Sequence, residues 1–118
     1  MFSDLIYSLE DWLKVKGALV EYYAEPMKEK QWGFCDYKNS QITITTNVCT
    51  ARSCLLTLLH EAGHWVFYLR NKGCYCEREY REKFAYLIGW TLNVRLCNSI
   101  FNKAEWREFH EDTIAGVA

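Results

Sequence analysis

The chain has 118 residues, 50% of them hydrophobic, which is enough for one core, so we expect residues 1–118 to form a single domain. Its 14 Lys and Arg are scattered among 15 Asp and Glu, for a formal net charge of −1. This distribution excludes the basic surface of a nucleic-acid-binding protein. The sequence has no apolar run long enough for a membrane span and no signal-peptide pattern at its start. We therefore expect a cytoplasmic protein with no membrane partner.

A helix is predicted near the N-terminus. Ser3 is the expected N-cap and Gly17 the expected end, so the helix covers about residues 4–16. Its apolar side chains recur at three- and four-residue spacing, as an amphipathic helix requires: Leu5, Leu9, Trp12 and Leu13.

A small sheet is predicted after this helix. Residues 18–24 are rich in β-forming side chains, and residues 32–37 form a second such segment after a loop at 27–31. A turn at residues 38–40 leads to Gln41–Thr45, which alternates polar and apolar side chains. We expect these segments to form an antiparallel sheet of about three strands, and the chain to have an α+β fold.

Two long helices and a short one are predicted in the second half. Thr50 is the expected N-cap and Gly73 the expected C′ residue of the first, which covers about residues 51–71. The second begins near Glu77 and presents one side formed by Phe84, Leu87, Ile88, Thr91, Val94 and Cys97. Ser99 or Asn102 is expected to end it. A short polar helix is then expected over Lys103–Glu111.

The first long helix contains the motif H-E-x-x-H, from His60 to His64. The four-residue spacing places both imidazoles on one helix face, where they can chelate zinc. Glu61 lies about 100° around the helix from His60, so it is better placed as a general base toward water than as a ligand. In so apolar a helix, these polar side chains would be costly unless something paired them. The sequence therefore predicts a site for one Zn²⁺.

The motif followed by a glutamate-rich helix resembles gluzincin zinc metallopeptidases, and this resemblance implies a third ligand from the start of the second long helix, at Glu77, Glu79 or Glu82. The residue four positions later shares the ligand's helix face. For Glu77 and Glu79 that residue is a cation, whereas for Glu82 it is Tyr86, which could hydrogen-bond the ligand. We name Glu82 as the ligand, with Glu79 as the alternative.

This pattern resembles the minimal gluzincin zinc metallopeptidases. Residues 33–37 and 42–44 resemble the strand pair before the metal helix of ImmA/IrrE-type peptidases. Phe84-Ala85 matches part of their ligand-helix signature, but Tyr80 stands where that signature has glutamate. SprT-like metalloproteases share the hairpin but supply a third histidine close by. Residues 82–89 also resemble the thermolysin-type ligand helix, with a tyrosine where that family has aspartate.

The resemblance implies a small zinc endopeptidase that acts on a protein or peptide, with Glu61 as general base. An extended substrate is expected to add as a strand along the edge of Gln41–Thr45. His110 or a tyrosine is a candidate for stabilising the oxyanion, although a surface histidine is the simpler interpretation of His110. The alternative function is a zinc-stabilised protein-interaction module, for a regulator or repressor, without turnover.

Six cysteines occur in the chain, and without a secretory signal we expect them to be reduced, several of them packed as small apolar side chains. Cys74-Tyr75-Cys76 is a candidate redox pair or second metal clip.

Overall fold

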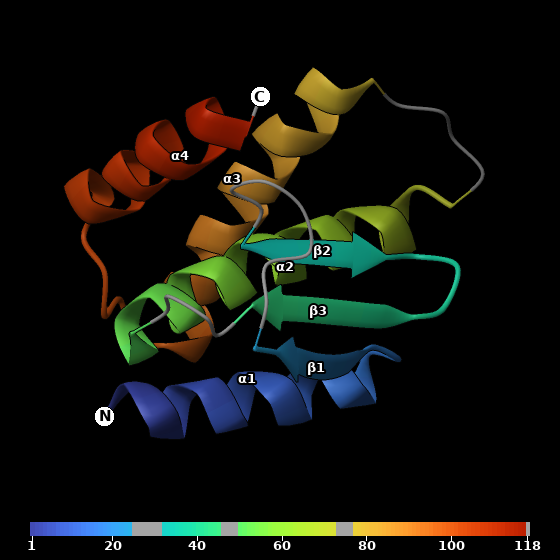
Figure 1. The fold of residues 1–118 in the computed structure, drawn as a ribbon, viewed down its shortest axis with the longest axis horizontal. Coiled ribbons are helices and arrows are strands. Elements are labelled where there is room, and N and C mark those ends of the chain that lie inside the picture. The colour runs from blue at the N-terminus through green and yellow to red at the C-terminus, as the bar shows by residue number, and fades with distance from the viewer. Residues whose placement is uncertain (25–31, 46–49, 73–76, 118) are drawn as a thin grey trace.

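The computed structural model describes residues 1–24, 32–45, 50–72 and 77–117, and for residues 112–117 the backbone alone. The chain has the predicted α+β fold, with four helices and three strands in this part (Figure 1). Their bounds are α1 (Phe2–Val15), β1 (Leu19–Tyr23), β2 (Gly33–Asp36), β3 (Gln41–Thr45), α2 (Ala51–Arg70), α3 (Arg78–Leu96) and α4 (Lys103–Val117). The expected loop at residues 27–31 lies outside the described residues.

The sheet has the strand order β1-β3-β2 and is mixed. β2 and β3 form an antiparallel hairpin through the turn at residues 37–40, with Cys35 opposite Ile42. β1 lies on the other side of β3 and runs parallel to it, with Leu19 opposite Gln41. The prediction of an antiparallel sheet is therefore wrong for this pair. Because β3 is central, Gln41–Thr45 has no free edge for a substrate, and that prediction is wrong as well.

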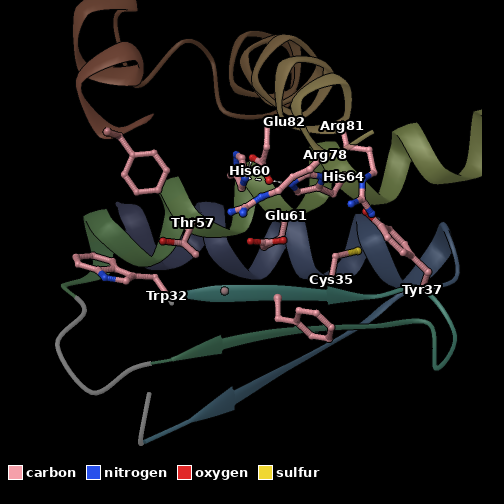
Figure 2. Close-up of a pocket in the computed structure, with 13 residues that line it drawn as sticks. Trp32, Cys35, Tyr37, Thr57, His60, Glu61, His64, Arg78, Arg81 and Glu82 are labelled. Carbon is pink, nitrogen blue, oxygen red and sulfur yellow. Dashed lines mark hydrogen bonds and ion pairs between the residues drawn. The ribbon is translucent and has the colours of Figure 1, made fainter. Parts of the chain in front are cut away.

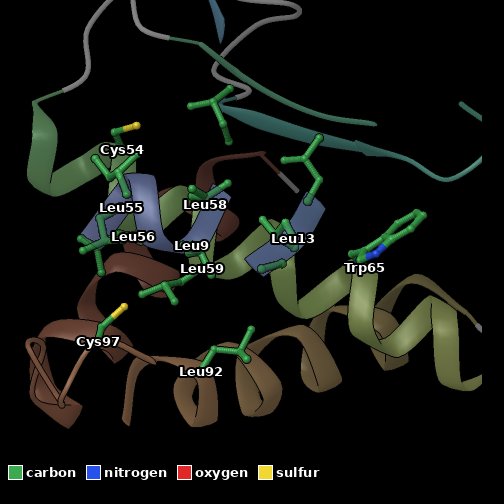
Figure 3. Close-up of a cluster of buried hydrophobic side chains, with 14 of the residues drawn as sticks. Leu9, Leu13, Cys54, Leu55, Leu56, Leu58, Leu59, Trp65, Leu92 and Cys97 are labelled. Carbon is green, nitrogen blue, oxygen red and sulfur yellow. The ribbon is translucent and has the colours of Figure 1, made fainter. Parts of the chain in front are cut away.

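Helix α2 is the central element of the fold. It packs against β2, β3 and α1, and also against α3. Figure 3 shows the apolar cluster around it, to which Leu9 and Leu13 of α1 and Leu92 of α3 contribute. The indole N–H of Trp65 donates a hydrogen bond of 3.0 Å to the carbonyl of Lys16, which ties α2 to the end of α1. A helix packed on so many sides is apolar nearly all round.

The helix ends agree only in part with the expected caps. Thr50 caps α2 by accepting a hydrogen bond from the backbone N–H of Ser53, and Gly17 follows α1 with a φ of +92°, as expected. Ser3 is not the N-cap, because it lies inside α1, which begins at Phe2 with Met1 as its N-cap. The ring of Phe2 stacks on that of Phe101. The expected C′ residue of α2, at position 73, lies outside the described residues.

The buried face of α3 differs from the predicted one. Leu87 and Val94, which the sequence places on the apolar side of this helix, are 47% and 42% exposed. The buried residues of α3 include the small Ala85 and Gly89, together with Leu92 and Asn93. Small residues let two helices approach closely, and this close approach outweighs the burial of larger apolar side chains.

Helix α4 is anchored to α3 by polar contacts at its start. Asn102 and Glu105 form a reciprocal cap, in which each side chain accepts a hydrogen bond from the other's backbone N–H. The side chain of Asn93, fully buried in α3, donates to the carbonyl of Phe101 and accepts from its N–H. The indole of Trp106 donates to the carbonyl of Tyr86. The helix is therefore fixed against α3, and its backbone continues past the predicted end to Val117.

Among the described cysteines, Cys35, Cys54 and Cys97 are buried, as expected for small apolar side chains. Cys35 and Cys97 are free thiols. The candidate pair at positions 74 and 76 lies outside the described residues. No helix in the described ranges combines the length and apolar character needed to span a membrane.

Candidate metal centre

Three side chains from α2 and α3 converge on one point. His60 and His64 project from successive turns of α2, and Glu82 reaches them from the second turn of α3 (Figure 2). The Nε2 atoms of the two histidines are 3.2 Å apart. The carboxylate of Glu82 lies 3.2 Å from Nε2 of His60 through Oε2 and 3.3 Å from Nε2 of His64 through Oε1. Each of the two histidine nitrogens is thus close to the other and to one oxygen of the Glu82 carboxylate.

The separations between these side-chain atoms fit a bound metal ion. In a tetrahedral zinc site, with bonds of about 2.0–2.1 Å, two ligand atoms are separated by about 3.3–3.4 Å. The three observed separations of 3.2, 3.2 and 3.3 Å match this value closely. Two imidazole nitrogens and one carboxylate oxygen are also a ligand set that suits zinc. His60, His64 and Glu82 therefore form a group that could hold a metal ion.

The charges of the group favour a cation at its centre. Burial alone would raise the pKa of Glu82, but its contacts with His60 and His64 outweigh burial and hold that pKa well below its usual range. Burial likewise opposes the charge on His64, yet the hydrogen bond to Glu82 and the charges of Glu61 and Glu82 raise its pKa. Oε2 of Glu82 is buried, and within the described chain its contact with Nε2 of His60 does not form a hydrogen bond of good geometry. A metal ion would satisfy this oxygen.

A close contact between the two long helices brings Glu82 within reach. A Cβ atom on Gly63 would lie 2.5 Å from the carbonyl oxygen of Ala85, nearer than any real side chain comes. Gly63 therefore lets α3 lie directly on α2. Because Ala85 is three residues after Glu82, the two share a helix face, and the contact turns the carboxylate toward α2.

Glu61 lies beside the three converging side chains but does not join them. Its side chain is 7% exposed, and burial raises the pKa of its carboxyl, partly offset by the two neighbouring imidazoles. In Figure 2 the carboxylate extends from α2 toward β2. This direction brings Glu61 against Gly33 at the start of β2.

A pocket of about 280 Å³ opens over these residues. One wall is formed by β2 and the residue before it, from Trp32 to Cys35, and the others by α2, α3 and Phe109 of α4. Three further polar side chains line it: Tyr37, Arg78 and Arg81. Two of these side chains, Arg78 and Arg81, carry guanidinium groups.

The structure distinguishes the three candidate third ligands. Glu82 alone among them belongs to the described group that could hold a metal, whereas Glu77 and Glu79 are exposed. Tyr86, expected to hydrogen-bond the ligand, instead packs its ring edge-on against His110.

His110 is not the surface histidine that the polar helix suggested. It is 8% exposed and lies behind His60, with its Nε2 atom 2.9 Å from Nδ1 of that ring. It is also not among the residues that line the pocket, so it does not face a substrate oxyanion. The sequence signal for this burial is the four-residue spacing of Trp106 and His110, one turn after the Asn102–Glu105 cap. The many charged residues next to Trp106 and His110 in the sequence make this spacing hard to recognise.

Comparison with known proteins adds no relative. No family model matches the chain, and neither a characterised protein nor a solved structure shows significant similarity to it. The gluzincin resemblance therefore depends on the motif and on the geometry of the candidate site.

Proposed function

We propose that this protein is a small zinc-dependent endopeptidase, with His60, His64 and Glu82 as the zinc ligands and Glu61 as the general base. The observation that carries the proposal is the convergence of His60, His64 and Glu82, with contacts of 3.2 to 3.3 Å between their side chains, beside a buried carboxylate in an open pocket. Zinc bound there would polarise the scissile carbonyl and lower the pKa of a coordinated water. A purely structural site needs ligands but no such base.

Glu61 would move the proton in this reaction. It would accept a proton from the attacking water and pass it to the departing amine. A buried carboxyl whose pKa is raised suits this exchange, because an acid–base catalyst works best when its pKa is near the working pH. Its position one residue after His60 places it next to the metal without making it a ligand.

Strand β2 is the edge along which we expect the substrate to lie. In the described sheet it pairs only with β3, so its other side is open to a further strand. It also forms a wall of the pocket, through residues 33–35. An extended peptide added to this edge would run past Glu61 and the metal ligands, and its main chain would be held by backbone hydrogen bonds.

The two arginines in the pocket favour a substrate with a carboxylate near the scissile bond. Arg78 and Arg81 form no ion pair with any described carboxylate. A guanidinium group binds a carboxylate through paired hydrogen bonds, which gives this interaction both strength and direction. Acidic peptides are therefore the substrate class that we expect the pocket to prefer.

The test is the Glu61→Gln variant, assayed with a peptide library by mass spectrometry and with zinc content measured in parallel. We expect wild type to cleave and the variant to keep its zinc but lose turnover. Glu79→Gln, an exposed change on α3, is the matched control and should behave as wild type. Wild type that binds zinc and a peptide without cleaving it, with Glu61→Gln unchanged, would instead support the interaction module.

A further inference from the structure

His110 makes two hydrogen-bond contacts, one with each ring nitrogen. Its Nδ1 atom lies 2.8 Å from the carbonyl oxygen of Trp106, one turn earlier on α4. Its Nε2 atom lies 2.9 Å from Nδ1 of His60. The ring is held edge-on between Trp106 and Tyr86, at centroid distances of 4.3 and 4.8 Å. The imidazole is therefore fixed in both position and orientation.

These contacts determine where the protons are. A carbonyl oxygen only accepts hydrogen bonds, so Nδ1 of His110 must carry a hydrogen. In a neutral imidazole the other nitrogen is then an acceptor, so Nδ1 of His60 must donate to it.

This arrangement of hydrogens affects Nε2 of His60, the atom proposed to bind the metal. With the hydrogen of a neutral His60 held on Nδ1, its Nε2 atom keeps the lone pair that a metal ion requires, and Nε2 is the atom that faces His64 and Glu82. His64 has no comparable support, since its buried Nδ1 lacks a hydrogen-bond partner in the described chain. Of the two histidines, His60 is thus the one whose tautomer is fixed by a hydrogen bond, through Nδ1 to His110.

We propose that His110 is a positioning residue, which holds His60 in its metal-binding tautomer and orientation and so couples the docking of α4 to metal affinity. The inference rests on the zinc site of the proposed function but not on catalysis. Outer partners of this kind commonly change metal affinity by about ten- to a hundredfold.

Three variants separate positioning from simple packing. His110→Phe keeps a ring but removes the acceptor, and His110→Gln restores an acceptor through its amide oxygen. Trp106→Phe removes the indole hydrogen bond to Tyr86 and weakens the docking of α4, yet leaves the carbonyl that His110 uses. Zinc affinity is measured by chelator competition. We expect His110→Phe to lower zinc affinity by about ten- to a hundredfold. His110→Gln should recover most of this affinity. Trp106→Phe should lower zinc affinity less than His110→Phe does when the two variants are equally destabilised toward heat.

The wild-type protein provides a readout that needs neither zinc nor turnover. Long-range ¹H–¹⁵N NMR of the metal-free protein should place the ring hydrogens of His60 and His110 on Nδ1. An Nδ1 atom of His60 without a hydrogen, or zinc affinities that follow thermal stability alone across the three variants, would overturn the proposal. A protein with the expected tautomers but no peptidase activity would refute the proposed function and leave this inference standing.

Discussion

Gly33 lies directly against Glu61. A Cβ atom at position 33 would come within 3.0 Å of Cγ and Oε2 of Glu61, and within 2.8 Å of Cγ2 of Thr57. The absence of a side chain thus lets the edge strand β2 pass close to the proposed base. The same contact sets the width of the pocket between β2 and α2.

Gly33→Ala should therefore impair catalysis without removing the metal. The new methyl group would push the Glu61 carboxylate aside, and displacement of a catalytic group by about 1 Å can cost up to a hundredfold in rate. We expect peptide turnover to fall by about ten- to a hundredfold, with zinc affinity close to that of wild type. Steady-state kinetics and chelator competition measure the two effects. An unchanged turnover would show that Glu61 does not act from this position.

Gly63→Ala, in contrast, should weaken zinc binding. Its Cβ would collide with the backbone of Ala85, which cannot rotate away as a side chain can. Helix α3 must then shift and carry Glu82 away from the histidines, so we expect zinc affinity to fall by about tenfold or more. Thr91→Ala, at an exposed position of α3, is the control and should change neither affinity nor stability. Normal zinc binding by Gly63→Ala would contradict the role of this contact.

The third ligand can be tested by comparing two glutamates on one helix. Glu82→Gln removes the carboxylate charge beside both histidines, whereas Glu79→Gln changes an exposed residue one turn earlier. We expect zinc affinity to drop by about tenfold or more in the first variant, as for other groups that hold a metal, and to be unaffected in the second. The reverse order would move the ligand to Glu79.

The two pocket arginines predict a preference among substrates. Replacing an aspartate by asparagine near the scissile bond of a cleaved peptide should raise KM about two- to fivefold, the effect of a partly exposed ion pair. The double variant with Arg78→Gln and Arg81→Gln should lose this difference. Arg95→Gln, an exposed arginine further along α3, should retain it. Equal KM values for the two peptides in wild type would rule out an acidic preference.

The sequence was most informative where local spacing determines the chemistry. The four-residue spacing of His60 and His64 requires a shared helix face. The residues around Glu82 on its helix face are uncharged, which allows that face to pack on another helix. This feature pointed to Glu82 as the glutamate that approaches His60 and His64. The alternation in Gln41–Thr45 likewise located β3 at its observed bounds.

What the sequence did not reveal depends on long-range pairing. The alternation in β3 does not mark an exposed face, because Thr43 and Thr45 are buried as well as the isoleucines. Nor does it show which strand lies beside β3, so the parallel pairing with β1 was missed. The burial of His110 depends on the way α4 docks onto α3 through Asn93 and Trp106. The exposure of Leu87 follows from close packing at Ala85 and Gly89, which no apolar pattern displays.

Zinc-edge anomalous diffraction from crystals grown with zinc is the most direct test of the metal centre. We predict one strong peak about 2.0–2.2 Å from Nε2 of His60, Nε2 of His64 and a carboxylate oxygen of Glu82, the bond lengths of a zinc site. The peak should be absent from crystals of the Glu82→Gln variant grown at a limiting zinc concentration. A protein with no peak at this position, or with zinc held by other residues, would contradict the proposed metallopeptidase centre.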